Sequence, residues 1–238
     1  MSASQLAAMS ALTSVGDTMS ATTWHAASRY IGISMELAAG ETHLAFGGLV
    51  RFHPNWMDLP KADDLLGELR ASVGWSQGTI VLFGREVQEP RLTAWYGDVD
   101  YTYSGRTMKA APWPPVLATL RSRVQAAVSV PLNTVLLNLY RDGKDSMGMH
   151  SDDEPELGRD PIIASVSLGA PRKFVLEPKR KSARRNGSYA LVLSHGSLLV
   201  MAGSCQHHYR HGVPKEAKCR GERINLTFRH VLVQPSGH

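Results

Sequence analysis

The sequence has little cysteine, no long apolar run and no signal for export. Its two cysteines, Cys205 and Cys219, are too few to staple a secreted fold and form no C-x-x-C pair, so reduced thiols are expected. No stretch reaches the roughly 18 uninterrupted apolar residues that a membrane span requires. The N-terminus lacks the charged region, apolar region and cleavage site of a secretory signal. These absences predict a soluble intracellular protein without a membrane partner, cytoplasmic in a bacterium and nuclear or cytoplasmic in a eukaryote.

The composition favours a globular protein with a local concentration of positive charge. The chain has 238 residues, 43% of them apolar, so it can bury a sizeable core. Its formal net charge of +5 bears on solubility and partners rather than on fold. Much of this charge lies in "EPKRKSARRNGS", whose cationic residues are Lys179, Arg180, Lys181, Arg184 and Arg185. Such a segment suits either contact with nucleic-acid phosphates or a solvated loop without a partner.

The first part of the chain differs from the rest in its lack of periodicity. Residues 1–45 are rich in Ala, Ser, Thr and Met and carry few charges, which predicts a poorly ordered N-terminal extension. No internal repeat and no second apolar core is evident in residues 46–238. We therefore expect those residues to form one domain.

Two helical segments precede a long series of strands. Leu66, Leu69 and Val73 recur at helical spacing after Pro60, and "PVLATLRSRVQAAV" shows the same pattern. From Thr134 onward, short β-branched or apolar runs alternate with turn residues. This arrangement predicts a mainly β fold with flanking helices, as in a β-sandwich or jelly roll.

The turn between two of these runs has a recognisable sequence. Asn186 and Gly187 separate "RKFVLEP" and its basic extension from "SYALVLS". Asn-Gly is the dipeptide that type I′ turns prefer, because both central residues of that turn need positive φ angles. The sequence therefore predicts a tight hairpin turn at this point.

One strand, "RINLTFR", is polar on one face and apolar on the other. Side chains alternate along a strand, so Arg223 and Arg229 share a face with the other polar residues of the segment. They are either exposed to solvent or, inside a barrel, a receptor for a small dicarboxylate, because each guanidinium can bind a carboxylate bidentately. Asn138 and Tyr140 of "LLNLY" also share a face and carry neutral donors suited to the same ligand.

A second cluster of chemically active side chains is "HSDDEP". His150 and Asp152 have the same i, i+2 spacing and can converge on a metal ion. Two imidazoles and one carboxylate on one side of a metal, with other positions open, are the ligands of non-haem Fe(II) oxygenases. A distal histidine is then required, and "CQHHYRHGVP" offers His207, His208 and His211, of which His211 lies closest to the arginine strand.

These segments occur in an order that resembles a known family. The set comprises "NLYRDGKDSMGMHSDDEPELG", "PIIASVSLGAPRKF", "HGSLLVMAG", "HGVPKE" and "RINLTFR", preceded by "PRLTAWYGDVDYTYSG". In this order they resemble the AlkB family of Fe(II)- and 2-oxoglutarate-dependent nucleic-acid dealkylases. The resemblance spans roughly Phe46 to Val233 and implies a double-stranded β-helix (jelly roll) core.

The resemblance implies a complete iron and cosubstrate site. His150, Asp152 and His211 are implied to hold Fe(II), and Arg223 and Arg229 to receive the two carboxylates of 2-oxoglutarate. The cosubstrates are 2-oxoglutarate and dioxygen, and the products of demethylation are the restored base, formaldehyde, succinate and CO2.

Further hydrogen bonds to 2-oxoglutarate are implied for three residues, Asn138, Tyr140 and Asn225. The partners implied are DNA or RNA with alkylated bases such as 1-methyladenine and 3-methylcytosine, and the protein is expected to be a monomer. Because this damage lies on the Watson-Crick edge, the base must be unpaired or flipped out.

Four residues are implied to contact the damaged base. Tyr103 is implied to cover one of its faces, with Tyr101 nearby and the His150 ring behind the other face. Asp153, and with it Glu154, is expected to accept a hydrogen bond from the exocyclic amino group and to favour the positive charge of the base. The alternative is that these carboxylates hydrogen-bond a metal ligand and hold it in place.

The role of Leu82 and Phe83 and the class of the whole protein each have an alternative interpretation. Leu82 and Phe83 in "TIVLFG" are either a wedge for the base stack of a duplex or part of a core strand. The rivals for the whole protein are an oxygenase acting on a substrate other than nucleic acid and a non-enzymatic zinc module. The zinc ligands of that module would be Cys205, His207 or His208, His211 and Cys219.

Overall fold

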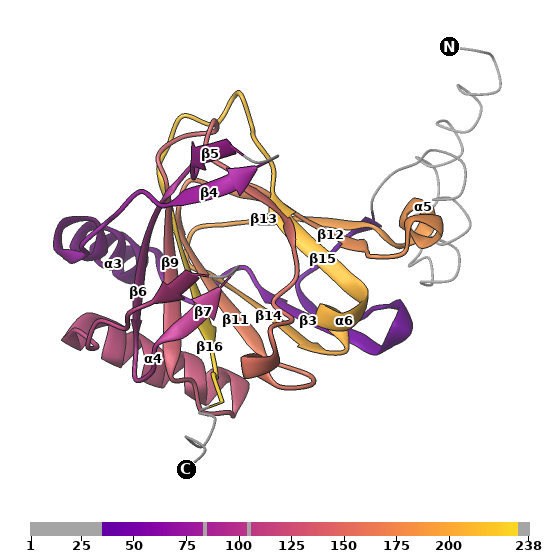
Figure 1. Cartoon of the computed structure of the whole chain (residues 1–238), viewed down its shortest axis with the longest axis horizontal. Coiled ribbons are helices and arrows are strands. Elements are labelled where there is room, and N and C mark those ends of the chain that lie inside the picture. The colour runs from indigo at the N-terminus through magenta and orange to yellow at the C-terminus, as the bar shows by residue number, and fades with distance from the viewer. Residues whose placement is uncertain (1–34, 83–84, 104–105, 233–238) are drawn as a thin grey trace.

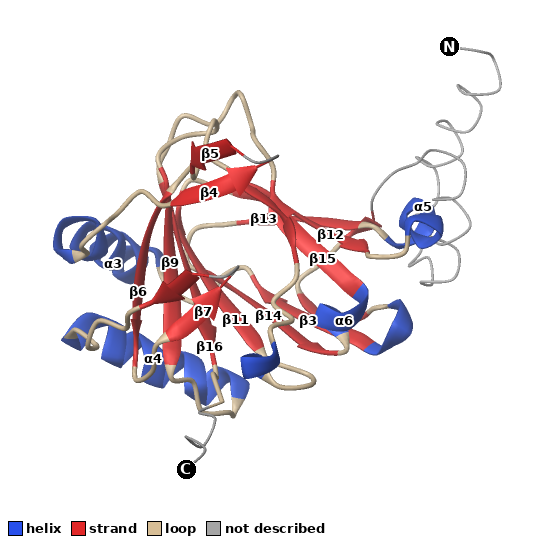
Figure 2. Cartoon of the chain, viewed as in Figure 1, coloured by secondary structure: helices blue, strands red, loops and turns tan. Residues whose placement is uncertain are grey.

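Two β-sheets face each other in the computed structural model, which describes residues 35–82, 85–103 and 106–232. Strands fill the centre of the molecule, and its two long helices lie together on one side (Figures 1 and 2). The described residues thus form the predicted jelly roll, or double-stranded β-helix, with flanking helices.

The larger sheet consists of antiparallel neighbours. Its strands, in spatial order, are β2 (Gly40–His43), β3 (Gly48–His53), β14 (Ser197–Gly203), β11 (Ile163–Gly169), β16 (Arg223–Arg229), β9 (Thr134–Tyr140) and β6 (Leu92–Gly97). In the smaller sheet the order is β1 (Met35–Glu36), β13 (Tyr189–Leu193), β12 (Arg172–Pro178), β15 (Tyr209–Val213) and β10 (Met147–His150). Only the β1 and β13 pair of this sheet is parallel.

Helices and two small hairpins complete the described chain. The long helices are α3 (Leu59–Ser72) and α4 (Pro115–Val128), and the short ones are α5 (Arg184–Gly187), α6 (Cys205–His208), η1 (Ala45–Gly47), η2 (Pro155–Leu157) and η3 (Lys181–Ala183). The hairpins are β4 (Thr79–Leu82) with β5 (Arg85–Gln88), and β7 (Tyr101–Tyr103) with β8 (Arg106–Met108). None of the described helices combines the length and hydropathy that a membrane crossing needs.

Helix α3 begins where its sequence predicts. The Asp58 carboxylate accepts a hydrogen bond from the backbone N–H of Lys61 (3.1 Å), and Pro60 occupies the first turn, where no intrahelical N–H is lost. Its Leu69 side chain is fully buried, and such a burial contributes roughly 1.5–3 kcal/mol. Helix α4 buries its own apolar stripe in the same way. The two helices therefore cover one face of the larger sheet (Figure 1).

The alternation of β16 separates two apolar cores. Its apolar residues, represented by Leu226 and Phe228, pack in the cluster that contains α3 and α4. Its polar residues point the other way, into the space between the sheets, where Arg223 and Arg229 are 0% and 3% exposed. A solvent-facing arginine strand is thereby excluded. The functional side chains of this strand lie in the interior.

Two expectations differ from the structure. Strands β1 and β2 precede the boundary expected after residue 45, so the folded region reaches back at least to Met35. These short strands carry no local sequence signal, because they are held by backbone hydrogen bonds such as Met35 N–H to Ser188 O (2.9 Å). The hairpin predicted from Asn186 and Gly187 is confirmed, because β12 and β13 pair antiparallel, but its tight turn is wrong: η3 and α5 connect the two strands. The expectation for residues 1–34 lies outside the described residues.

Candidate metal and cosubstrate site

The three proposed iron ligands meet at one edge of the smaller sheet. His150, at the end of β10, is the register partner of His211 in β15. Asp152 follows two residues later, and its carboxylate oxygens lie 3.9 Å from His150 Nε2 and 3.8 Å from His211 Nε2. The ligand atoms all fall within 4.8 Å of one another. This spacing suits a shared metal ion, because all three atoms face the same point.

A glycine permits this close approach. A Cβ atom built on Gly212, next to His211, would lie 2.9 Å from the carbonyl oxygen of Met147 in β10. The register of β10 against β15 also shifts between Met147 and His150. Such a shift bends a strand and redirects its side chains. The chain can thus leave the sheet after His150 and turn the Asp152 carboxylate toward both imidazoles.

The Asp152 carboxylate is ionised although it is fully buried. Burial raises its pKa, but the charge of Arg229 and the two imidazoles outweigh that effect and hold the pKa at about 2. Arg229 donates a hydrogen bond from Nη2 to Asp152 Oδ1 (2.8 Å). The other oxygen, Oδ2, is buried and makes no hydrogen bond to any described residue. A buried anionic oxygen in this state fits a cation between the three ligands.

Both imidazoles present a nitrogen lone pair. His150 Nδ1 lies 2.9 Å from the carbonyl oxygen of Gly148, and because a carbonyl only accepts, Nδ1 carries the proton and Nε2 the lone pair. His211 is buried and stacks on Phe174 with ring centroids 5.5 Å apart. Burial, together with the neighbouring His150, lowers the pKa of His211 to about 3. A neutral imidazole is the form that binds a metal.

The cosubstrate end of the site contains a buried cation. Arg223 donates hydrogen bonds from Nη2 to Ser167 Oγ (2.9 Å) and to Asn225 Oδ1 (2.6 Å). Its Nε and Nη1 are buried and make no hydrogen bond to any described residue. Burial lowers the pKa of Arg223, yet a guanidinium stays charged near neutral pH. Donors of this kind fit a carboxylate of a bound anion, as the sequence predicts for 2-oxoglutarate.

The neutral donors predicted for the cosubstrate lie beside these arginines. Asn138 and Tyr140 are 3% and 2% exposed and line the cavity between the sheets. The Tyr140 ring lies between two guanidinium groups, with Cζ of Arg223 5.2 Å and Cζ of Arg172 5.5 Å from its centroid. Asn225 Oδ1 also accepts a hydrogen bond from a serine of β11. Asn225 therefore orients Arg223, and its direct contact with 2-oxoglutarate stays a prediction.

Three supporting residues escaped the sequence analysis. Arg91 donates from Nε to Asn138 Oδ1 (2.8 Å), and the Gln206 Oε1 atom accepts from the backbone N–H of Asp152 (2.9 Å). Arg172 is fully buried and donates to three backbone carbonyls, of Asp142 (3.1 Å), Asp145 (2.8 Å) and Pro214 (2.7 Å). Arg172 opens the strand RKFVLEP, whose alternation places it on the same face as Phe174 and Leu176, and this was the available signal for its burial.

Of the four residues predicted to contact a base, the structure describes the side chains of Asp153 and Glu154. Asp153 lies at the rim, where its Oδ2 atom is 2.7 Å from Lys179 Nζ. Glu154 is half-buried and occupies the N-cap position of η2, where its side chain makes no capping hydrogen bond. Tyr101 and Tyr103 form strand β7, but their side chains lie outside the described part of the chain. The same holds for the side chain of Leu82, and Phe83 is a residue that the structure does not describe.

The zinc alternative finds no support among the described residues. The only cluster of three or more His, Cys, Asp or Glu side chains there that could share a metal ion is the one containing His211. His207, in contrast, lies 3.2 Å from the Asp160 carboxylate. Cys205 is buried and Cys219 half-buried, and both are free thiols. The four proposed zinc ligands are therefore not gathered.

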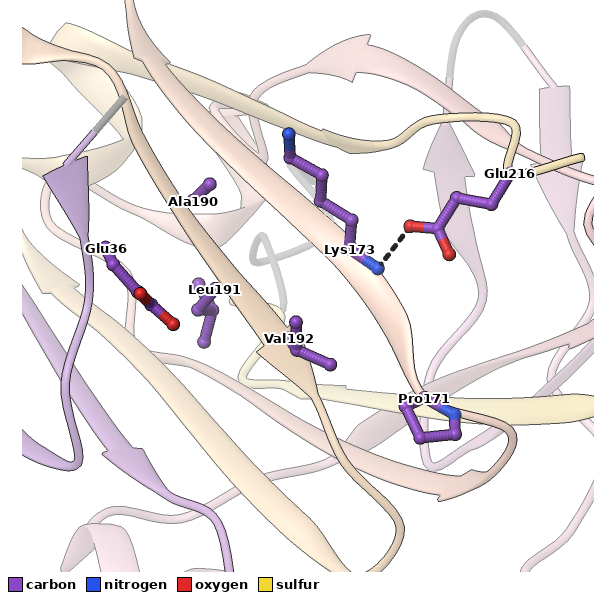
Figure 3. A pocket seen from close by; sticks show the side chains of 7 residues that line it. All are labelled: Glu36, Pro171, Lys173, Ala190, Leu191, Val192 and Glu216. Carbon is purple, nitrogen blue, oxygen red and sulfur yellow. Dashed lines mark hydrogen bonds between the residues drawn. The ribbon is translucent and has the colours of Figure 1, made fainter. Parts of the chain in front are cut away.

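A second pocket, of about 250 Å³ and larger than the cavity at the metal site, lies on the outer face of the smaller sheet (Figure 3). In it the backbone N–H of Lys173 donates to Glu216 Oε1 (2.7 Å), and Glu36 lies across from Val192. Phe174, the next residue after Lys173, points to the opposite side and lines the metal site. The outer pocket thus belongs to a different face from the chemistry.

Comparisons with known proteins agree with this geometry. The sequence model of the 2OG-Fe(II) oxygenase superfamily matches residues 49–229. Human alpha-ketoglutarate-dependent dioxygenase alkB homolog 3 is 46% identical over 195 residues, covering 79% of this chain and 68% of that protein. Human DNA oxidative demethylase ALKBH2 is 40% identical over 182 residues, covering 73% and 70%.

A solved structure supports the fold. The structure of OsALKBH1 superimposes with a TM-score of 0.53 at 18% identity, covering 80% of this chain and 99% of that one. The matched region spans about two thirds of the human alkB homolog 3. Because the superfamily model, these relatives and the His-Asp-His cluster agree, the chain belongs to the AlkB family of Fe(II)- and 2-oxoglutarate-dependent dioxygenases.

Proposed function

We propose that this protein removes methyl groups oxidatively from alkylated nucleobases of DNA or RNA, releasing formaldehyde, succinate and CO2. The observation that carries the proposal is the triad of the half-buried His150 with the buried Asp152 and His211, to which Arg229 of the arginine strand is hydrogen-bonded. The names of two relatives, a dioxygenase and a DNA oxidative demethylase, support this substrate class.

The residues divide the work between two ends of one cavity. His150, Asp152 and His211 hold the iron, and Arg223 and Arg229 bind the carboxylates of 2-oxoglutarate. Bound iron with 2-oxoglutarate and dioxygen supplies the oxidising chemistry that hydroxylates the alkyl carbon. The protein's own contribution is to position these reactants and to exclude competing reactions.

Hydrogen bonds between cavity residues orient the groups proposed to bind 2-oxoglutarate. Asn138 and Tyr140 offer neutral donors, and Arg91 fixes the amide of Asn138 by occupying its carbonyl oxygen. The amide N–H groups of Asn138 are thereby turned toward the cavity that the residue lines. Asn225 holds Arg223 in the matching orientation.

The rim selects the substrate. A base alkylated at its Watson-Crick nitrogen is cationic and must leave the duplex or come from a single strand. Asp153 is suited to accept a hydrogen bond from its exocyclic amino group and to favour its charge. Tyr101 and Tyr103 cover the base, with Glu154 near its edge. We further propose that the protein is a monomer, cytoplasmic in a bacterium and nuclear or cytoplasmic in a eukaryote.

The test uses the intact protein loaded with Fe(II) and 2-oxoglutarate without oxygen. Dioxygen is then admitted with methylated single-stranded DNA, duplex DNA or RNA, and formaldehyde is measured. Unmethylated strands and a methylated peptide are the controls. We expect formaldehyde only from methylated nucleic acid. Turnover stimulated by the peptide alone would identify an oxygenase with a different substrate.

A further inference from the structure

The carboxylate expected to read the base is already occupied by a lysine. Asp153 Oδ2 lies 2.7 Å from Lys179 Nζ, and the two side chains are 48% and 35% exposed. A cationic base that approached this paired carboxylate would meet an ammonium as well as an anion. It would therefore gain little electrostatic attraction until the lysine moved.

Lys179 is fixed at its backbone and weakly held at its ammonium. Its N–H donates to the carbonyl oxygen of His208 (2.8 Å), and its own carbonyl oxygen accepts from Arg184 Nη2 (3.2 Å). The ammonium group is held by an exposed ion pair, an interaction with little net strength. The flexible four-carbon stem can therefore carry the ammonium to another anion without disturbing the fold.

The surroundings of Lys179 favour a phosphate as that anion. Lys179 opens the basic segment, and the next two residues, Arg180 and Lys181, are exposed to solvent. Arg184, in contrast, is used within the fold, where it donates to the carbonyl oxygens of Pro178 and Lys179. The exposed cations raise the local positive potential at the rim, which attracts a polyanionic backbone.

We propose that Lys179 is a specificity-determining residue that covers Asp153 until the phosphate of the bound nucleotide draws its ammonium away. The inference rests on the proposed function. Phosphate and base of one nucleotide are separated by a single sugar, so a base at Asp153 brings its own phosphate near Lys179. The exchange leaves every charge paired: base with Asp153 and lysine with phosphate. A free nucleoside cannot make this exchange, and the site therefore favours polynucleotides.

The experiment compares two substrates that differ in their phosphates. Formaldehyde release is measured with a methylated nucleoside and with a methylated single-stranded oligonucleotide, for the wild-type protein, Lys179→Met and the control Lys181→Met. Lys179→Met should raise kcat/KM for the nucleoside about two- to fivefold. It should lower kcat/KM for the oligonucleotide about tenfold near 0.1 M salt. Lys181→Met should leave the nucleoside reaction unchanged.

A second measurement does not depend on turnover. The salt dependence of binding to a methylated oligonucleotide, measured without dioxygen, should fall by about one unit of log–log slope in Lys179→Met. The double variant Lys179→Met with Asp153→Asn should lose the gain with the nucleoside, because no carboxylate is left to uncover.

The outcomes separate the two proposals. An active wild-type protein whose Lys179→Met variant shifts both substrates in the same direction, or neither, would overturn this inference alone. A wild-type protein that releases formaldehyde from neither substrate would overturn the proposed function and this inference with it. Opposite shifts, absent from Lys181→Met, would establish the exchange.

Discussion

The two sheets contribute to the site in opposite ways. In the larger sheet, β16 pairs without interruption with β9 along all seven of its residues, and it carries both arginines. In the smaller sheet, β10 pairs with β15 through a register shift; the proposed metal ligand His150 ends β10, Asp152 follows it, and His211 lies in β15. A regular strand fixes the spacing of two cations, which suits a ligand of fixed length. An irregular strand end lets side chains from two strands and the following loop meet at one point, which regular alternation along one strand cannot do.

The bond between Arg229 and Asp152 joins these two regions. Arg229, on β16, donates a hydrogen bond to Asp152 of the proposed metal cluster. We therefore expect changes at Arg229 to affect both the metal end and the cosubstrate end of the cavity, and changes at Arg223 to affect the cosubstrate end alone. Variants in each sheet can test that claim.

The largest effect is expected at the metal end. His150→Ala or His211→Ala should abolish iron-dependent turnover, by roughly a hundredfold or more, because even outer partners of metal ligands change affinity about 10- to 100-fold. Formaldehyde release and calorimetric binding of Fe(II) without oxygen measure the loss. His43→Ala is the control, since this side chain is 80% exposed. Full activity in either ligand variant would remove that residue from the site.

The arginines should separate the two ends of the cavity. Arg229→Ala and Arg223→Ala should each raise the 2-oxoglutarate requirement about 10- to 100-fold, because each loses a charged hydrogen bond to a carboxylate. Only Arg229→Ala should also weaken Fe(II) binding, because it removes the hydrogen bond that orients the Asp152 carboxylate. Metal affinity and the KM for 2-oxoglutarate are measured side by side. An unchanged 2-oxoglutarate requirement would reject the carboxylate role of that arginine.

Arg172 tests whether the smaller sheet also supports the cosubstrate end. Arg172→Met removes the donor to three backbone carbonyl oxygens and the guanidinium contact with the Tyr140 ring. Unfolding free energy should fall by about 2–4 kcal/mol, and the KM for 2-oxoglutarate should rise severalfold. Denaturant unfolding and steady-state kinetics measure the two effects, with the exposed Lys173→Met as control. A loss of stability without a change in KM would make Arg172 purely structural.

The smallest effect is expected at the rim. Asp153→Asn keeps the size of the side chain but removes its charge, so it should weaken demethylation a few-fold while sparing succinate formed without substrate. The ratio of formaldehyde to succinate measures this uncoupling. Equal losses of both products would instead favour a structural role for Asp153 beside the metal cluster.

Much of this architecture could be predicted from local pattern. The α3 and α4 helices follow from apolar spacing and from Asp58 and Pro60, because helix signals act within a few residues. The polar face of β16 follows equally from alternation. In contrast, β1 was missed because its pairing with the distant β13 decides its structure, and the hairpin at Asn186 was predicted with too tight a turn, because η3 and α5 form the connection.

By itself, the sequence determined which side chains carry the chemistry and how they are spaced along each strand. Only the tertiary structure decided that the arginine face turns inward, that Arg91 and Arg172 support Asn138 and Tyr140, and that Lys179 covers Asp153. The reason is physical. Alternation fixes which residues share a face, but the partner of that face depends on contacts between residues far apart in the chain, such as Arg229 with Asp152.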